Sequence, residues 1–394
     1  MSRLDELIAE LCPDGVAYEK LGRICVSLKK ETLKQESLRD DAEYPVINSG
    51  RDFYCYYTSY NNDGDALCIA SRGEYAGFIT YIDRKFWAGG LCYPYSSKNK
   101  KIIITKFIFY YLKSKEKYIM SSIVARGSIP ALNKIDIEKL SIPVPPLPVQ
   151  EEIVRILDNF AELTAELTAE LSKRKQQYQY YRDMLLTFDD IKATSQTDRQ
   201  TDRQTDRQTA INSVVWRQII DICEISRGKV ISKDYIRNSI GDYPVYSSQT
   251  ENEGELGRIS TYMHDGEYIT WTTDGANAGS VFYRFGKFSI TNVCGLLKII
   301  DNNILTKYVY YSLGRVTKEY VNSGMGNPKL MSNMIAKIKI PVPHLEEQKR
   351  IVAILDRFDA LCNDLTSGLP AEIEARKKQY EYYRDKLLTF KEAV

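Results

Sequence analysis

Histidine is the scarcest reactive residue in this chain of 394 residues, which contains only His264 and His344. The eight cysteines are spread singly, and no two of them form a Cys-x-x-Cys pair. A zinc site of the usual ligand spacing would therefore be hard to build. We expect reduced, buried thiols and a cytoplasmic protein. General acid–base catalysis also has few candidate groups here.

Several signatures of enzymes and membrane proteins are missing as well. No apolar run approaches the ~20 residues of a membrane helix. No GxxxxGK[ST] motif and no glycine-rich cofactor loop is present, which argues against NTP hydrolysis. The string Asn327-Pro328-Lys329-Leu330 lacks the second proline and the aromatic residue of an Asn/Asp-Pro-Pro-aromatic adenine methyltransferase motif. We therefore expect a binding protein with no catalytic residues and no bound metal or cofactor.

What the chain does contain is an internal repeat. IPVPPLPVQEEIVRILDNF at 142–160 matches IPVPHLEEQKRIVAILDRF at 340–358 in 12 of 19 positions. RKQQYQYYRDMLLTF at 174–188 matches RKKQYEYYRDKLLTF at 376–390 in 12 of 15. The two offsets, 198 and 202, differ by four residues. That difference of four residues falls in the array AELTAELTAEL at 161–171, which is itself a repeat of four residues.

Weaker likenesses join the two blocks that precede these motifs. Tyr44-Pro-Val resembles Tyr243-Pro-Val, and Arg72-Gly-Glu-Tyr-Ala-Gly77 aligns with Asp274-Gly-Ala-Asn-Ala-Gly279. Phe86 aligns with Phe288 and Cys92 with Cys294, at the offset of 202 that relates Arg72 to Asp274. The repeat therefore predicts two globular units that share a framework and differ in surface residues.

Apolar and turn patterns predict the elements of these units. β-Branched and aromatic runs broken by Gly, Asn and Asp indicate strands between 46 and 104, and 106–117 and 307–313 look helical. Apolar spacings of three and four predict one long helix over 151–188 and a similar one in the second copy. At ~1.5 Å per residue, each would span roughly 57 Å. The N-terminal MSRLDELIAEL predicts a short amphipathic helix ended by Pro13-Asp14-Gly15, not a signal peptide.

The predicted fold is α+β, with two α/β domains separated by two long antiparallel coiled-coil helices and a pseudo-twofold internal repeat. The alternative is that each apolar stripe packs only on its own block. The predicted boundaries are 1–146 for the first domain, 147–190 for the first helix, 191–212 for a linker, 213–344 for the second domain and 345–394 for the second helix. The linker holds the array TDRQTDRQTDRQ at 197–208, which has no apolar residue with which to bury a face.

The duplicated IPVPPLPxQEEIVRILD and RKxQYxYYRDxLLTF motifs with the TAEL array resemble the specificity subunits of type I restriction–modification systems, most closely the type IC group. This resemblance covers nearly the whole chain. It implies that each domain reads one half of a bipartite sequence in double-stranded DNA. It also implies that the helices dock two methylation subunits for adenine methylation, and that two motor-nuclease subunits add ATP-dependent cleavage of unmodified DNA. S-adenosylmethionine, ATP and Mg would then be bound by the partner subunits.

The tetrad array has a physical interpretation within this family. Each tetrad adds ~6 Å of helix, comparable with one or two base-pair steps of ~3.4 Å. We therefore expect the array to set the length of the unread DNA spacer. The alternative is that the tetrads only fill the coiled coil.

Candidate DNA-binding residues are polar or cationic side chains in or near glycine-flanked loops, where the backbone can approach a ligand closely. Plain turn or surface roles remain the alternative for each. The candidates are Arg72, Tyr75, Lys85, Arg126 and Ser128 in the first block, and Thr273, Asn277, Arg284, Lys287 and Lys329 in the second.

Candidate partner-binding residues occur twice, at the starts and ends of the long helices, and the tyrosines could instead only cap the helix pair. They are Leu147, Gln150, Tyr180, Tyr181 and Arg182 in the first copy, and Leu345, Gln348, Tyr382, Tyr383 and Arg384 in the second. Two other functions stay open at this stage: a coiled-coil scaffold that joins two β-rich protein-binding modules, and the specificity arm of a single-chain methyltransferase without its catalytic domain.

Overall fold

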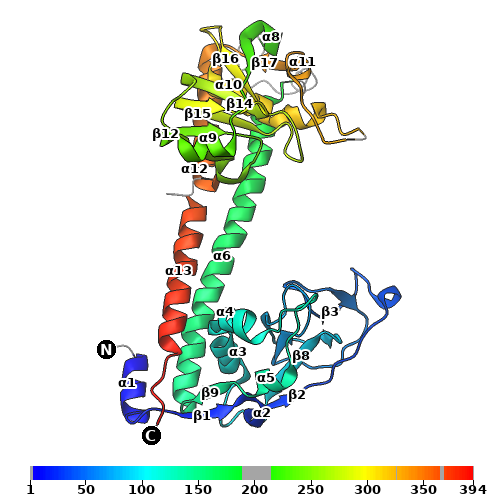
Figure 1. Ribbon diagram of the computed structural model, residues 1–394, viewed down its shortest axis with the longest axis vertical. Coiled ribbons are helices and arrows are strands. Elements are labelled where there is room, and N and C mark those ends of the chain that lie inside the picture. Colours follow the sequence, from blue (N-terminus) through cyan, green and yellow to red (C-terminus); the bar gives the residue numbers. More distant parts are fainter. Residues whose placement is uncertain (1–2, 189–213, 325, 364–367, 394) are drawn as a thin grey trace, which may run out of the picture. The chain divides into compact units, whose positions relative to one another are not determined.

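The computed structural model describes residues 3–188, 214–324, 326–363 and 368–393 (Figure 1). The chain divides into two compact units. Unit 1 comprises residues 1–169 and 372–394, and unit 2 comprises residues 170–371. Each unit therefore combines one globular domain with the start of one long helical segment and the end of the other. The predicted linker 191–212 and its TDRQ array lie outside the described residues.

Unit 1 contains three sheets. One has the order β2 (Cys25–Ser27), β8 (Cys92–Ser97), β5 (Ala66–Ala70), β6 (Ile79–Ile82), and another the order β4 (Cys55–Tyr57), β3 (Tyr44–Ile47), β7 (Trp87–Ala88). β1 (Ala17–Lys20) pairs with β9 (Ser141–Val144). The short helices are α1 (Arg3–Leu11), α2 (Leu21–Ile24), η1 (Gln35–Ser37), α3 (Thr105–Ser114), α4 (Glu116–Tyr118), the π-turn η2 (Ile119–Ile123) and α5 (Lys134–Glu138).

Unit 2 repeats this architecture with a larger sheet. Its order is β11 (Cys223–Arg227), β16 (Cys294–Ile299), β14 (His264–Thr272), β15 (Val281–Ile290), β12 (Ile240–Tyr246), β13 (Glu255–Ile259). β10 (Val215–Gln218) pairs with β17 (Lys339–Val342). The short helices are α8 (Ile219–Ile222), α9 (Lys233–Asn238), η4 (Glu251–Gly254), α10 (Thr306–Val316), η5 (Thr317–Tyr320) and α11 (Ser332–Ile335).

The strand registers confirm the predicted internal repeat. Ala70 pairs with Cys92 in unit 1, as Thr272 pairs with Cys294 in unit 2. Val46 pairs in parallel with Trp87, as Val245 pairs with Ser289. In unit 2 the ten-residue β15 contacts both neighbouring strands and merges the sheets, whereas in unit 1 the corresponding stretch is divided into β6 and β7. The two domains thus share one topology.

The long helices are α6 (Leu147–Leu186), α12 (Leu345–Asn363) and α13 (Leu369–Leu387). α6 begins at Leu147, where the predicted boundary of the first helix lies, and four residues before the start at 151 that the apolar spacing alone indicates. Pro148 is tolerated there because the first turn of a helix has no intrahelical use for that N–H group. The second segment is described as two helices, on either side of residues 364–367.

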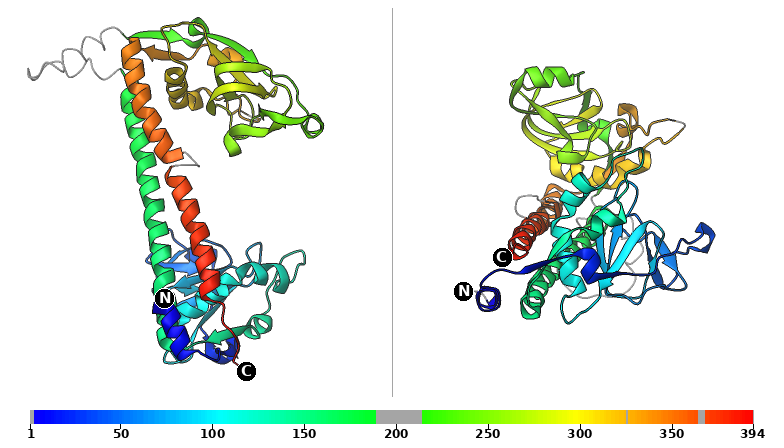
Figure 2. Two further views of the ribbon diagram at one scale, coloured as in Figure 1. Left: turned by 90° about the vertical axis from the view of Figure 1, so that its left-hand side faces the viewer. Right: turned by 60° about the horizontal axis from the view of Figure 1, so that its bottom comes forward.

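The apolar stripe of each long helix packs both on the opposite helix and on the domain of its own unit. In unit 1 the ring of Phe160 on α6 stacks on Tyr383 of α13, with centroids 5.6 Å apart. In unit 2 Phe358 of α12 stacks on Tyr181 of α6 at the same distance. The segments are antiparallel, and Figure 2 shows α13 beside the start of α6. Val149 and Ile153, at the start of α6, also lie in the domain core around α3. The predicted antiparallel pairing and the predicted α+β fold class are therefore both confirmed, and each helix start packs on its own domain as well.

The ends of the described chain are joined within unit 1. The Val16 amide donates to the carbonyl of Lys391, and the Ala393 amide donates to the carbonyl of Val16, at 2.9 and 3.0 Å. α1 ends before the Pro13-Asp14-Gly15 turn, as predicted, and Gly15 adopts a φ of +102°. A Cβ atom at Gly15 would lie 2.6 Å from the Lys391 carbonyl oxygen, so this close approach requires glycine.

Candidate DNA-reading and docking surfaces

A glycine loop joins β5 to β6 in unit 1 and β14 to β15 in unit 2. The Gly73 amide donates to the carbonyl of Pro130 at 3.0 Å, and the Gly275 amide donates to that of Pro328 at 2.9 Å. Both glycines have φ above +85°, a conformation that favours glycine. Each loop is thereby tied to a second loop far along the chain, and the two units present the same pair of loops.

In unit 1 this loop pair brings together three of the predicted DNA-binding residues. The backbone of Arg72 forms an isolated antiparallel β-bridge with Ala131. Ala131 forms a second one with Ala125, which is next to Arg126 in the chain. Arg72, Arg126 and Ser128 are exposed. Tyr75 is half-buried, and the guanidinium of Arg51 lies 4.8 Å from its ring centroid.

Cations also pack on aromatic rings elsewhere in the domain of unit 1. Beyond Tyr75, the residues in these contacts are Arg51, Phe53, Arg84, Lys85 and Tyr60. Arg84 lies 5.5 Å from the centroid of Phe53, and Lys85 lies 4.2 Å from that of Tyr60. Of these residues, the sequence analysis named only Tyr75 and Lys85. The string Gly50-Arg-Asp-Phe-Tyr54, with its exposed turn chemistry, is the signal that could have pointed to Arg51 and Phe53.

In unit 2 the corresponding loop pair contains a carboxylate whose negative charge is compensated by two neighbouring cations. Asp274 lies 3.5 Å from Arg227 and 3.9 Å from Lys329 in ion pairs. Lys329 is exposed and Asn277 is half-buried on the glycine loop. Thr273 is a correction: its side chain is buried, and its hydroxyl is bonded to Arg227 and to Asp274. It therefore lies inside the domain rather than on a reading surface.

Arg284 is a second correction, because it is only 4% exposed. Its guanidinium lies 3.6 Å from the ring centroid of Tyr246 and donates to Thr270 Oγ1 at 3.2 Å. It also donates to the carbonyl of Glu253. The aligned positions of unit 1 hold Ile82, Ile47 and Cys68, which form an apolar cluster. Arg284 is thus an internal cation of unit 2 and is not available to a phosphate in this conformation.

The carbonyl that Arg284 holds belongs to a strained turn. Asn252 and Glu253 both adopt left-handed backbone conformations, with φ of +47° and +52°. Such a conformation costs a non-glycine residue of order 1 kcal/mol or more. The buried guanidinium offsets part of this strain by fixing the turn, so Arg284 positions the loop before β13.

Gln150 and Gln348 are also corrections, because both side chains are fully buried. Gln150 accepts from the Ile104 amide at 2.9 Å and donates to the carbonyls of Ile102 and Pro145. Gln348 makes the equivalent bonds to Leu305, Asn303 and Pro343. These amides lock the start of each helix onto its own domain and leave no group free for a partner.

About two helical turns further on, a carboxylate that the sequence analysis missed completes each junction. Asp158 accepts from Lys106 at 2.8 Å and from the hydroxyl of Tyr110. Asp356 accepts from Lys307 and Tyr311, both at 2.7 Å. Burial, and then the hydrogen bond to the carboxylate, raises the pKa of both tyrosines. The shared Ile-Leu-Asp string of the two copies was the available signal.

The predicted docking residues at the helix ends share one geometry. Tyr180 and Tyr382 are 66% and 63% exposed, whereas their neighbours Tyr181 and Tyr383 pack on the opposite helix through the stacked rings described above. Arg182 lies 6.0 Å from the centroid of Tyr178, and Arg384 lies 5.6 Å from that of Tyr380. Leu147 and Leu345 are half-buried. The structure therefore presents Tyr180 and Tyr382 as two equivalent exposed aromatic side chains.

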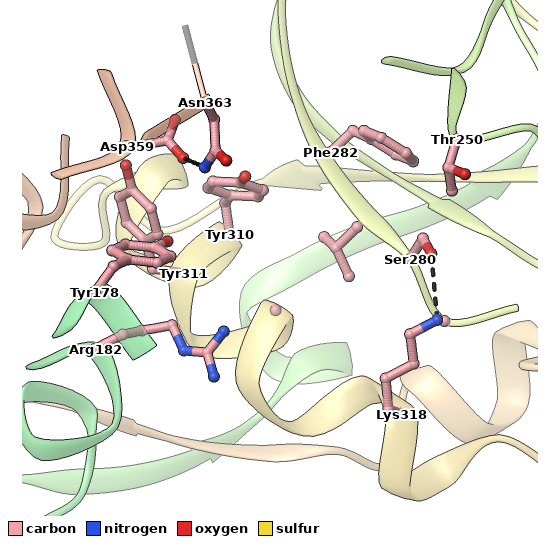
Figure 3. A pocket seen from close by; sticks show the side chains of 13 residues that line it. Tyr178, Arg182, Thr250, Ser280, Phe282, Tyr310, Tyr311, Lys318, Asp359 and Asn363 are labelled. Atoms are coloured by element: carbon pink, nitrogen blue, oxygen red, sulfur yellow. Dashed lines mark hydrogen bonds between the residues drawn. The ribbon is translucent and has the colours of Figure 1, made fainter. Parts of the chain in front are cut away.

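A hollow of about 320 Å³ lies in unit 2 beside Arg182 (Figure 3). It is lined by residues of α6, α10, η5, α12, β15 and the glycine loop, among them Tyr178, Tyr310, Lys318 and Asp359. Gly314 and Ser280 line it where the aligned positions of unit 1 hold Lys113 and Phe78. In unit 1 the Lys113 ammonium lies 4.0 Å from the Phe78 centroid and pairs with Glu116. The side chains at this place therefore differ between the two units.

Two further observations concern the described residues as a whole. None of their helices combines the length and apolarity of a membrane span. Among the same residues, no three His, Cys, Asp or Glu side chains are grouped as metal ligands would be.

Comparisons with known proteins agree with the duplicated architecture. The family described as "Type I restriction modification DNA specificity domain" matches residues 13–174 and again residues 213–375. The EcoR124I/EcoR124II specificity subunit of Escherichia coli is 30% identical over 425 residues, which cover 99% of this chain and 97% of that protein. A putative type I specificity subunit of Mycoplasma pneumoniae is 45% identical over 245 residues, covering 62% of this chain and 91% of that protein.

The fold likeness extends to solved structures. The S subunit of a type I restriction–modification system from M. genitalium has a TM-score of 0.66 and 18% identity, covering 95% of this chain and 96% of that one. Two matches to the family, one in each half, leave little of the chain outside it. The chain belongs to the family of type I restriction–modification specificity subunits, and it carries the family's specificity domain twice.

Proposed function

We propose that each domain of this chain reads one half of a bipartite sequence in double-stranded DNA. The observation that carries this proposal is the pair of equivalent loops on one shared frame. The frame is the same in both units, but the exposed residues on it differ, as at Arg72 and Asp274. Two similar readers of different base sequences need this combination. A two-part contact also multiplies selectivity, since each mismatched base pair costs ~1–3 kcal/mol.

The paired helices dock two methylation subunits, one near each end of the repeat. Tyr180 and Tyr382 support this part of the proposal, because exposed tyrosines are common anchors in protein interfaces. S-adenosylmethionine is bound by the methylation subunits, which methylate adenine. Two motor-nuclease subunits, with ATP and Mg, add cleavage of unmodified DNA. This chain supplies selectivity and no catalytic group.

Sequencing of methylated DNA tests the reading function. The chain is co-expressed with the methylation subunit of its own system, and N6-methyladenine is located across the host genome. We expect one sequence with two defined halves and an unread spacer of fixed length. Methylation without sequence preference, or at a single uninterrupted sequence, would contradict the proposal and favour a protein-binding scaffold.

Native mass spectrometry of the same complex tests the docking sites. Tyr180→Ala and Tyr382→Ala should each remove one of the two methylation subunits, and the double variant should remove both. Tyr54→Ala, which removes a tyrosine that is 56% exposed on the domain of unit 1, is the control. Retention of two methylation subunits by the double variant would refute this assignment.

A further inference from the structure

Two tyrosines and a lysine form the same exposed cluster in both units. In unit 1 the rings of Tyr44 and Tyr60 lie 5.1 Å apart, measured between centroids. Lys85 lies over the Tyr60 ring and donates a hydrogen bond to its hydroxyl at 2.9 Å. Tyr60 is 37% exposed and Lys85 is exposed.

Unit 2 builds its cluster from Tyr243, Tyr262 and Lys287. The two rings lie 4.9 Å apart. Lys287 lies 4.7 Å from the centroid of Tyr262 and 6.0 Å from that of Tyr243. Tyr262 is 43% exposed and Lys287 is exposed.

The strand registers show that these clusters occupy equivalent places. Tyr44 starts the strand whose Val46 pairs with Trp87, and Tyr243 lies on the strand whose Val245 pairs with Ser289. Each lysine stands two residues before that pairing partner. The residue before each lysine is not retained: Arg84 of unit 1 corresponds to Gly286 in unit 2. The exposed lysine is therefore shared although its neighbour in the sequence differs.

A feature that both readers share must serve a ligand that both readers meet. The bases of the two half-sites differ, whereas the phosphate backbone is the same in each. An ammonium group carries three donors, and Lys85 uses one of them on Tyr60. Its other donors, together with the phenol hydroxyl close by, suit the oxygens of one phosphate.

The charges around the clusters are compatible with an anion. Within the described residues, neither lysine is held in an ion pair with a carboxylate. Asp63 is the acidic neighbour of Lys85, and Asp265 lies on β14 opposite Lys287 in the strand register. Glu43 faces Tyr44. The hydrogen bond to Tyr60 raises the pKa of Lys85, and the nearby hydroxyl of Tyr262 raises that of Lys287. Both ammonium groups are therefore fully charged at neutral pH.

We propose that the Tyr44–Tyr60–Lys85 and Tyr243–Tyr262–Lys287 clusters each bind one phosphate of the DNA backbone, in the same way in both half-sites. The clusters fix the position of each domain on the duplex, and they do not contribute to base selectivity. This inference rests on the proposed function of the chain as a reader of bipartite DNA.

The salt dependence of DNA binding tests the inference. The complex of the chain with its methylation subunit is titrated with cognate DNA between about 50 and 200 mM salt. Lys85→Gln and Lys287→Gln should each reduce the slope of log K against log[salt] by about 0.9, and the double variant by about 1.8. The methylated sequence should stay unchanged. The controls are Lys101→Gln and Lys298→Gln, exposed lysines whose aligned positions in the other unit hold Asn302 and Ser96.

Three results would overturn the inference. The first is an unchanged slope with a lower melting temperature, which would make the lysines internal pins of the fold. The second is loss of the methylation subunit without DNA, which would make the clusters protein contacts. The third is a slope that changes in only one unit. The proposed function fails separately, if the unmodified complex itself shows no sequence-selective binding.

Discussion

Replacing Gln150 by leucine should loosen the junction between α6 and the domain of unit 1. Leucine is close to glutamine in size but can neither donate nor accept. The substitution would leave the Ile104 amide and the carbonyls of Ile102 and Pro145 without the partner that now satisfies them. At ~1 kcal/mol net for each hydrogen bond, the loss amounts to about 3 kcal/mol. Gln348→Leu should cost unit 2 the same amount, because its three bonds have nearly the same lengths.

Amide hydrogen exchange on the full chain in complex with its partner measures this loss where it occurs. We expect the protection of the Ile104 amide to fall by roughly two orders of magnitude in Gln150→Leu, since ~1.4 kcal/mol corresponds to a factor of ten. Leu305 should respond in the same way to Gln348→Leu. Gln176→Leu, at an exposed site on α6, is the control. A loss below about 0.5 kcal/mol in both variants would show that the glutamine locks do not hold the helices to the domains.

Two further changes test the strained turn and the tetrad array. Arg284→Met retains packing on Tyr246 but removes the donor to the Glu253 carbonyl. It should therefore relax base selection in one half-site only. If methylation sequencing finds both halves of the recognised DNA sequence unchanged, the turn has no part in base recognition. Deletion of residues 164–167 removes one tetrad, or ~6 Å of helix, and should shorten the unread spacer by one or two base pairs. A spacer of unaltered length in the same assay would count against the array as a ruler.

The sequence predicts the frame well because the frame depends on local patterns. The duplicated helix motifs, the Pro13-Asp14-Gly15 turn and the glycine loops each use residue types whose conformational preferences are strong. The apolar spacing alone starts the first long helix at 151, four residues late, although the first turn of a helix accepts Pro148. Boundaries that depend on one residue's context are harder to predict than the elements themselves.

The sites were predicted less well because burial depends on distant neighbours. A glutamine stands at the same position in both copies, as Gln150 and Gln348. This duplication fits a docking surface and an internal lock equally well. What decides between them is the backbone of residues 102–104, which the sequence alone does not bring near. Arg284 was predicted to contact DNA because the sequence shows a cation near a glycine loop. Its internal partners, Tyr246 and Thr270, lie on other strands, and the sequence alone does not bring them near it. Lys85 and Lys287 were named as DNA-binding candidates, but the tyrosines that lie beside them come from other parts of the chain and were not foreseen.

Under the proposed function, the exposed residues that differ between the units predict how the two half-sites differ. Arg72 of unit 1 presents an exposed cation on the glycine loop, suited to guanine or to phosphate. The aligned Asp274 presents a carboxylate, which DNA phosphates would repel if it stood alone. Arg227 and Lys329 compensate that charge and leave a locally basic surface around an acceptor. A carboxylate in such a setting can accept from cytosine N4. The two loops therefore suit different base edges on a common frame, which is what reading two unlike half-sites requires.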